Sequence, residues 1–175
     1  MRLETERIVL RDLEPGDYDA LRSMMDADTM WAYAHAFSDG EVAEWLEKQI
    51  LRRRIWGFSL CAVELKETGE VIGQCGVTVQ DCLDAHVPEI GYVFRRDRWH
   101  HGYATEAALA CRDYAFETLG FNEVFSIIRD VNQASRRVAL RLGMEPRAVM
   151  MKHYHGVDMP HIVYGISRAE LSGSI

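Results

Sequence analysis

The stretch "RWHHGYATEAA", Arg98–Ala108, constrains the fold more than any other part of this sequence. Bulky and imidazole side chains precede a glycine, and an alanine-rich segment that favours helix follows it at once. A strand-like segment, "PEIGYVF", precedes the turn, and another, "NEVFSIIRDV", follows the helix. The pattern predicts a β-α-β unit from Glu89 to Val131, with two parallel strands joined by a right-handed crossover.

The turn itself is suited to binding an anion. A helix that begins near Gly102 has backbone amides without partners in its first turn, and its dipole adds about half a positive charge there. The sequence has no G-x-x-x-x-G-K-[ST] and no G-x-G-x-x-G after a first strand, which disfavours P-loop and dinucleotide-binding folds. We therefore expect an anion at Gly102, with Arg95, Arg96 and Arg98 placed to assist.

Hydrophobic periodicity predicts one domain over residues 1–175, without a linker, repeat or low-complexity tract. Ser38 and Glu41 have capping-box spacing ahead of one of the helices. We expect a mixed α/β fold, in which a central, twisted, mostly antiparallel sheet with one parallel pair is flanked by helices. The other expected strands are 6–13, 57–65, 70–80 and a hairpin over 148–167, and the other expected helices are 17–25, 38–54 and 132–143.

Composition narrows the function classes. A net charge of −7 disfavours a nucleic-acid partner and suits a cationic one better. The four cysteines show no C-x-x-C spacing, so we expect them to pack as small apolar side chains in a reducing cytoplasm. The sequence shows no secretory leader and no run of 18 apolar residues, so we expect no membrane partner.

Three segments together resemble the GNAT superfamily of acyl-CoA-dependent N-acetyltransferases: "PEIGYVF", "RWHHGYATEAAL" and "VNQASRRVALRLGM". The branch that looks most similar is the RimJ/RimL type, which includes ribosomal-protein N-terminal acetyltransferases. The superfamily's acyl-CoA motif, Q/R-x-x-G-x-G/A, falls on Trp99–Ala104, where the glycine and the alanine match. The first position departs from it, but this branch often carries W-x-x-G-Y-A-T-E-A, which the chain follows. The resemblance covers nearly the whole chain, from "LETERIVLRDL" to "HIVYGI".

The resemblance implies that acetyl-CoA is the acyl donor and that no metal takes part. Its pantetheine arm would lie between two splayed strands, "EIGYVF" and "VFSIIRD", and its pyrophosphate would bind the amides of residues 100–105. An N-x-x-S pattern of the branch falls on Asn132 and Ser135, which would touch the donor near its thiol end. The donor-binding residues implied in this way are Tyr92, Val93, Phe94, Arg98, Trp99, His100, His101, Gly102, Tyr103, Ala104, Thr105, Asn132 and Ser135.

Acetyl transfer to an amine needs a neutral nitrogen, a stabiliser for the oxyanion and a proton for the departing thiolate. Many GNAT enzymes supply that proton from a Tyr seven residues after the motif Asn, but this chain has Ala139 there. Ser135 is the expected substitute. Glu89 is the best candidate for the base, His35 is a second one, and a backbone amide near Val93 is the expected oxyanion donor.

The sequence leaves the acceptor open. We expect the aromatic loop "MWAYAHAF" to shape its pocket through Trp31, Tyr33, His35 and Phe37. An α-amino group with a pKa near 8 is about 10% neutral at pH 7, against about 0.04% for lysine, so a protein N-terminus needs only a modest base. The alternatives are a small amine (a polyamine, an amino acid or an antibiotic) or a non-catalytic acyl-CoA sensor, which Ala139 would allow. A homodimer is compatible with the sequence.

Two further charged segments have ordinary explanations. His153 and His155 lie two apart near Asp158 and His161, which superficially resembles a metal site. No Cys or Glu accompanies them at a characteristic spacing, and the resemblance makes this hairpin a wall of the acceptor site. The run "RRR" at residues 52–54 is expected to be a solvated helix end, where cations favour the helix dipole.

Overall fold

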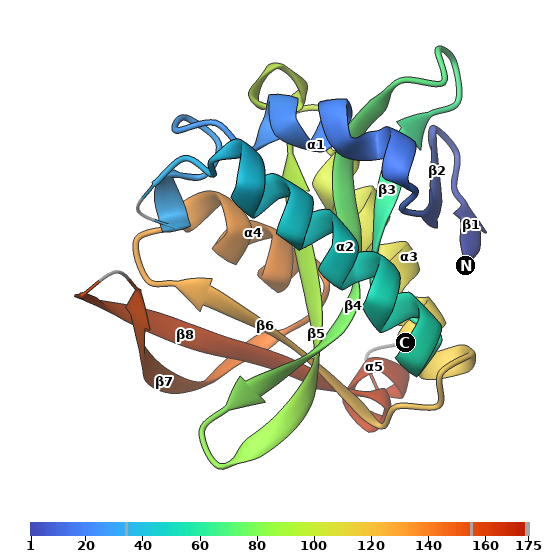
Figure 1. Ribbon diagram of the computed structural model, residues 1–175. Helices are drawn as coiled ribbons and strands as arrows, with labels where there is room; N and C mark the ends of the chain where they lie inside the picture. Colours follow the sequence, from blue (N-terminus) through green and yellow to red (C-terminus); the bar gives the residue numbers. More distant parts are fainter. Residues whose placement is uncertain (34, 155, 174–175) are drawn as a thin grey trace.

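The computed structural model describes residues 1–33, 35–154 and 156–173. Within them the strands form an eight-stranded sheet in the order β1-β2-β3-β4-β5-β6-β8-β7 (Figure 1). Neighbouring strands are antiparallel except for β5 and β6, which are parallel. This confirms the predicted mixed sheet with one parallel pair. The strands are β1 (Arg2–Glu4), β2 (Ile8–Asp12), β3 (Leu60–Leu65), β4 (Val71–Cys82), β5 (Ala85–Phe94), β6 (Glu123–Arg129), β7 (Glu145–Tyr154) and β8 (Val157–Ser167).

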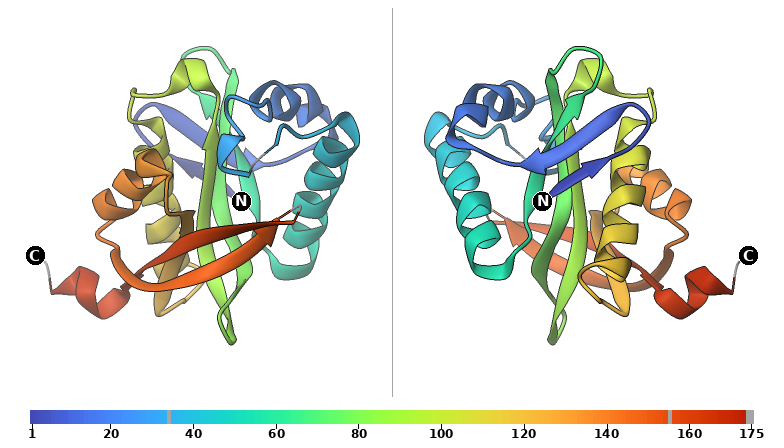
Figure 2. Two further views of the ribbon diagram at one scale, coloured as in Figure 1. Left: turned by 90° about the vertical axis from the view of Figure 1, so that its left-hand side faces the viewer. Right: turned by 90° about the vertical axis from the view of Figure 1, so that its right-hand side faces the viewer.

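Helices cover both faces of the sheet (Figure 2). One face carries α1 and α2, and the opposite face carries α3 and α4. None of the described helices is both long enough and apolar enough to cross a membrane. The α-helices are α1 (Tyr18–Met24), α2 (Asp39–Trp56), α3 (Tyr103–Glu117), α4 (Gln133–Arg141) and α5 (Arg168–Ser172), and the 3-10 turns are η1 (Pro15–Asp17), η2 (Trp31–Tyr33) and η3 (Arg96–Arg98).

The α3 helix packs closely on the sheet because its inner face consists of small side chains. Ala107, Ala108, Cys111 and Ala115 have no exposed surface, as the sequence predicts for this face. All four cysteines are buried and free, and Cys111 Sγ lies 3.6 Å from Cys75 Sγ. They pack as apolar side chains, as expected.

Local sequence signals explain most of the boundaries. Ser38 and Glu41 form the predicted capping box at the start of α2. β1 and α5 are not predicted, because three and five residues are too few to show a hydrophobic period. β5 begins at Ala85, three residues before the predicted Pro88, because residues 85–87 continue the hairpin with β4.

Gly76 lies on β4 where the neighbouring chain leaves no room for a side chain. A Cβ at this position would meet Ser59 O at 2.3 Å and Leu60 Cα at 2.7 Å, and both are backbone atoms. We expect Gly76→Ala to lower the free energy of unfolding by about 3 kcal/mol or more, which lowers Tm by roughly 6–12 °C in a domain of this size. Thermal and urea unfolding measure this change.

The matched control is Gly40→Ala in the first turn of α2. A Cβ at Gly40 has no heavy atom within 4 Å, and the position is helical. We expect this variant to be as stable as the wild type, or up to about 1 kcal/mol more stable, because alanine favours helix. Equal unfolding curves for both variants would contradict the steric argument at Gly76.

Candidate active site

The parallel strands β5 and β6 diverge almost as soon as they meet. Their ladder has a single registered pair, Glu89 with Phe125, and Figure 1 shows the two strands separating beyond it. In a continued parallel ladder the N–H of Ile127 would donate to the C=O of Ile90. The strands therefore form the wedge that the resemblance implies, with its vertex at Glu89.

Two side chains satisfy the backbone groups that the divergence leaves unpaired. The carboxylate of Glu89 accepts a hydrogen bond from the Ile127 N–H, with an Oε1–N distance of 3.1 Å. The Ser126 hydroxyl donates to the Ile90 carbonyl at 2.9 Å. Because buried backbone groups rarely stay unpaired, these two bonds stabilise the vertex of the wedge.

Strand alternation decides which β5 amides face the gap. The Arg95 N–H donates to the Ile72 carbonyl of β4, whereas the Ile90 carbonyl faces β6. The register between β5 and β4 is regular throughout. The N–H groups of Tyr92 and Phe94 therefore face the wedge. The amide of Val93, the oxyanion donor expected from the sequence, faces β4 instead.

The turn before α3 has the backbone geometry of an open helix start. Gly102 is the N-cap residue with φ +86°, in the left-handed region that favours glycine, and His100 has φ +64°. The first intrahelical bond runs from the Glu106 N–H to the Gly102 carbonyl, so the amides of residues 103–105 have no acceptor within the helix. Side chains cap α2, α4 and α5, but a glycine cannot cap α3. This start leaves its amides available to an anion.

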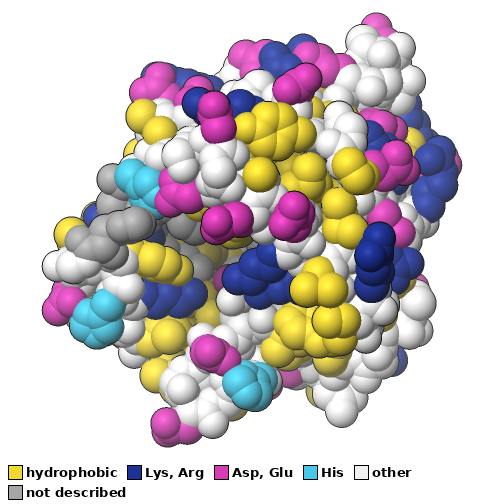
Figure 3. Space-filling view, in the orientation of Figure 1, with side chains coloured by type: hydrophobic (Ala, Val, Ile, Leu, Met, Phe, Trp, Pro, Cys, Tyr) yellow, Lys and Arg dark blue, Asp and Glu magenta, His cyan; other side chains and the backbone are white. Residues whose placement is uncertain are grey.

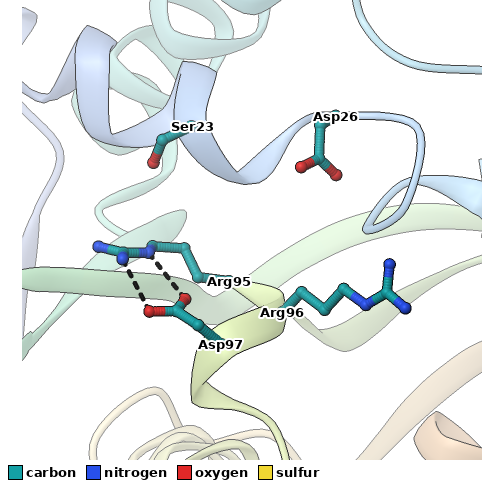
Figure 4. Close-up of a pocket in the computed structure, with 5 residues that line it drawn as sticks. All are labelled: Ser23, Asp26, Arg95, Arg96 and Asp97. Atoms are coloured by element: carbon teal, nitrogen blue, oxygen red, sulfur yellow. Dashed lines mark hydrogen bonds and ion pairs between the residues drawn. The ribbon is translucent and has the colours of Figure 1, made fainter.

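The arginines just before this turn are held elsewhere. Arg98 does not line the cleft, contrary to the sequence-based expectation, because its guanidinium pairs with Glu70 at 2.6 Å. Arg95 pairs with Asp97 at 2.8 Å, and also with Glu70. Figure 4 shows Arg95, Arg96 and Asp97 around a separate depression that Ser23 and Asp26 complete.

Other cations occupy the place expected for those arginines. Arg7, in the β1–β2 turn, donates to His101 O at 2.9 Å, pairs with Glu106 at 2.6 Å and lies 4.6 Å from the centroid of the Tyr103 ring. Arg137 and Arg141 on α4 also line the cleft. The sequence spacing could have indicated Arg137 and Arg141 together, because residues four apart share one helix face. No comparable spacing in the sequence points to Arg7.

A cleft of about 1260 Å³ joins the wedge to the start of α3. His101 and Tyr103 belong to the turn but do not line the cleft, and their rings stack with centroids 5.8 Å apart. The expected donor-binding residues that do line it are Tyr92, Val93, Phe94, Trp99, His100, Gly102, Ala104, Thr105, Asn132 and Ser135.

The aromatic loop before α2 contributes only in part. Trp31 and Phe37 line the cleft. His35 does not, because its Nε2 lies 2.9 Å from Glu41 Oε1 and its ring stacks on Phe37 with centroids 5.3 Å apart. The side chain of Tyr33 lies outside the described part of the structure.

The start of α4 closes the wedge from the face that also carries α3. Asn132 caps the helix by accepting a hydrogen bond from the Ser135 N–H at 3.1 Å. The Tyr92 hydroxyl donates to the Ser135 carbonyl at 2.9 Å, and burial raises the pKa of Tyr92 above its usual value. Ala139 is fully buried on the same helix. Tyr92 and Ser135 thus both line the cleft with a hydroxyl group at this end. The sequence predicted a role in proton transfer for Ser135 only.

The charge state of Glu89 is set by competing interactions. Burial raises the pKa of its carboxyl, and the nearby charges of Lys152 and Arg52 and the hydrogen bond from Ile127 lower it. Burial is the largest of these effects, so the pKa stays above its ordinary value. A raised pKa makes this carboxylate a stronger base than an exposed one.

The C-terminal hairpin forms one wall of the cleft through Lys152, Tyr154 and His161. His153 forms an ion pair with Asp158, and His155 lies outside the described residues. Within residues 1–33, 35–154 and 156–173, no three His, Cys, Asp or Glu side chains are grouped so that they could hold a metal ion.

A wedge between parallel strands, next to an open helix start, defines a class of acyl-CoA-dependent transferases, and comparison with known proteins agrees. A family model described as an acetyltransferase (GNAT) domain matches residues 7–145. The uncharacterized protein YkkB of Bacillus subtilis (strain 168) is 39% identical over 145 residues, which cover 82% of this chain and 84% of YkkB. An acetyltransferase structure from Agrobacterium tumefaciens strain C58 has a TM-score of 0.79 and 29% identity, and covers 96% of this chain and 95% of its own.

A likeness of fold alone extends to RimL, a ribosomal L7/L12 alpha-N-protein acetyltransferase solved in complex with coenzyme A. Its TM-score is 0.79 at 16% identity, and the match covers 95% of this chain and 98% of RimL. Because the family model spans most of the sequence, the chain belongs to the GNAT acetyltransferase family. It is an acyl-CoA-dependent N-acetyltransferase.

Proposed function

We propose that this enzyme transfers the acetyl group of acetyl-CoA to an α-amino group in the cytoplasm, as a single-domain enzyme of the RimJ/RimL type. The observation that carries this proposal is the uncapped start of α3 beside the wedge, since it offers free amides and an apolar slot in one cleft. The likeness of fold to RimL supports an N-terminal amine as acceptor. A weak amine of that kind suits a site with one moderately basic carboxylate.

The residues present fit the donor. The amides of residues 103–105 and the cations Arg7, Arg137 and Arg141 would hold its phosphates, and the backbone of Tyr92 would meet its pantetheine arm. When bound, acetyl-CoA supplies an activated acyl carbon, to which the amine nitrogen bonds as the C–S bond breaks. The Tyr92 and Phe94 amides face the gap and are the candidates to stabilise the oxyanion.

Glu89 is the base in this proposal. It lies at the vertex of the wedge, and its Oε1 would take a proton from the attacking nitrogen, directly or through water. His35 is paired with Glu41 outside the cleft, so the proposal gives it no part in proton transfer.

Two hydroxyls compete for the role of protonating the thiolate. We expect Ser135→Ala to lower kcat about 10-fold or more if the Ser135 hydroxyl is the donor, and Tyr92→Phe to do so if the phenol is. Stopped-flow thiol release separates them, because only the variant that lacks the proton donor should lose rate. Wild-type rates in both variants would mean that solvent protonates the thiolate.

An amine panel tests the function itself. Thiol release from acetyl-CoA would be measured with N-terminal peptides, free amino acids, polyamines and an aminoglycoside. We expect turnover with the peptides. Turnover with small amines alone would replace the proposed acceptor, and tight binding of acetyl-CoA without turnover would make the chain a sensor. Sedimentation with and without the donor would test the expected homodimer.

A further inference from the structure

Four cationic side chains line the end of the cleft that lies away from α3, on the far side of the wedge. Lys48 and Arg52 come from α2, Arg129 from the end of β6 and Lys152 from β7. The run at residues 52–54 was expected to be a solvated helix end. Arg52 is half-buried, so that expectation is wrong for this residue. Figure 3 shows Lys and Arg side chains in and beside the hollow between α2 and the β7–β8 hairpin.

These cations form no ion pair within the described part of the chain. None of the four has a carboxylate oxygen of a described residue within 4.0 Å of its side-chain nitrogens, although the chain carries an acidic excess. Arg129 donates only to the carbonyls of Trp31 and Ala32, each at 3.3 Å, and Arg52 lies 5.4 Å from the Trp56 ring centroid. Elsewhere in the molecule arginines such as Arg95 and Arg98 are paired. Within the described residues, no ion pair therefore neutralises the positive charge at this end of the cleft.

Glu89 is the carboxylate that Lys152 and Arg52 face. The other carboxylates that line the cleft, Glu6 and Glu106, lie at the opposite end near α3, where Glu106 is paired with Arg7. The charges of Lys152 and Arg52 reach Glu89, yet neither residue forms an ion pair with it. Four cations and one carboxylate line this part of the cleft, so its lining carries a positive charge that would repel a polyamine or any other purely cationic acceptor.

The phosphates of the donor do not account for this charge. Of the other cations that line the cleft, Arg7 contacts the turn before α3, and Arg137 and Arg141 lie on α4, which shares one face of the sheet with α3. α2, which carries Lys48 and Arg52, covers the opposite face (Figure 2). The two groups of cations thus lie at separate ends of the cleft.

We propose that the acceptor is an amine that also carries a carboxylate, which Arg52 and Lys152 bind while the amino nitrogen lies beside Glu89. This inference rests on the proposed function and adds the chemical class of the acceptor. An acidic N-terminal peptide and a dicarboxylic amino acid share this chemistry. An unpaired guanidinium and an ammonium group on facing walls suit a carboxylate between them.

The test compares acceptors that differ in one carboxylate. Kinetics would use the peptide amides Ser-Glu-Ala and Ser-Gln-Ala, and the α-amides of glutamate and glutamine, so that peptide and amino-acid sources are separated and the neutral member of each pair has no carboxylate. Binding of the α-amides of N-acetylglutamate and N-acetylglutamine in the presence of CoA would be measured by calorimetry, which needs no turnover. We expect the acidic member of at least one pair to have a KM, or a product Kd, about 10-fold lower or more.

The variants Arg52→Gln and Lys152→Gln should each reduce that preference severalfold, and the double variant should abolish it. The control is Arg54→Gln, an exposed residue of the same helix that does not line the cleft, which should leave the preference unchanged. Equal binding of both N-acetylated products would overturn this inference whether or not turnover occurs. Equal turnover of acidic and neutral amines would also overturn it and leave the proposed function standing. Absence of thiol release with every amine would refute the proposed function alone.

Discussion

Replacing Glu89 by Gln is expected to lower kcat about 100- to 10,000-fold, the range that a positioned general base contributes. The substitution keeps the shape of the side chain, and the amide oxygen can still accept the hydrogen bond from Ile127. Stopped-flow or coupled assays of thiol release over pH 5–9 would measure the effect.

The pH profile identifies the group. The neutral amine and the ionised carboxylate are the active forms, so kcat/KM of the wild type should fall at low pH for two reasons, protonation of the amine and protonation of Glu89, whose pKa burial raises above its ordinary value. In the Gln variant the part of this acidic limb that Glu89 causes should be absent, and the fall with pH should be that of the amine alone. A merely structural role for Glu89 would lower the rate and leave the shape of the limb unchanged.

Stability gives an independent readout. Because the folded state raises the pKa of Glu89, this residue favours folding fully below its unfolded pKa, and the contribution is lost as pH rises through the folded pKa. The Gln variant should therefore be at least as stable as the wild type at pH 7, and this difference should vanish near pH 4. Urea unfolding at both pH values measures it.

Ser126→Ala is the matched control at the vertex. It removes the bond to the Ile90 carbonyl but no titratable group, so we expect a loss of less than about 10-fold in kcat with the acidic limb intact. An equal loss of rate in both variants, with unchanged pH profiles, would show that the vertex acts only by holding the strands.

The parts of the fold that could be predicted are those specified by neighbouring residues. The capping box at Ser38, the small-residue face of α3 and the β-α-β unit around Gly102 each depend on local spacing. Their boundaries follow from the same signals. The order of strands across the sheet was not predicted, and the wedge was expected only from the resemblance to a family.

The charges of the site could not be predicted, because ion-pair partners lie far apart in the sequence. Arg98 is next to the α3 turn in the sequence, yet its partner Glu70 holds it away from the cleft. Arg7 is more than 90 residues from His101 and reaches it in the fold. Likewise, a net charge averages over the whole surface, so it does not reveal the cations that line the cleft with Glu89.

Introducing a carboxylate at Thr105 should strongly lower the affinity for the acyl donor without destabilising the fold. Thr105 is the third residue of α3 and lines the cleft. An acidic side chain at a helix start is stabilising by about 0.3–1 kcal/mol, so Thr105→Glu should have an unchanged or slightly higher Tm. The same charge would lie close to the bound diphosphate. At a separation of about 5 Å and an effective dielectric constant of about 20, the repulsion is about 3 kcal/mol, or roughly 100-fold in affinity.

Calorimetric titration of CoA into both proteins at fixed ionic strength measures this loss, and higher salt should partly restore binding because it screens the added charge. Thr105→Val is the matched control, since it keeps the branched shape and adds no charge. It should bind CoA within about threefold of the wild type, because in our proposal backbone amides and not the hydroxyl hold the diphosphate. If Thr105→Glu bound CoA as tightly as the wild type while remaining folded, the phosphates would have to lie elsewhere. The glycine turn would then have no part in donor recognition.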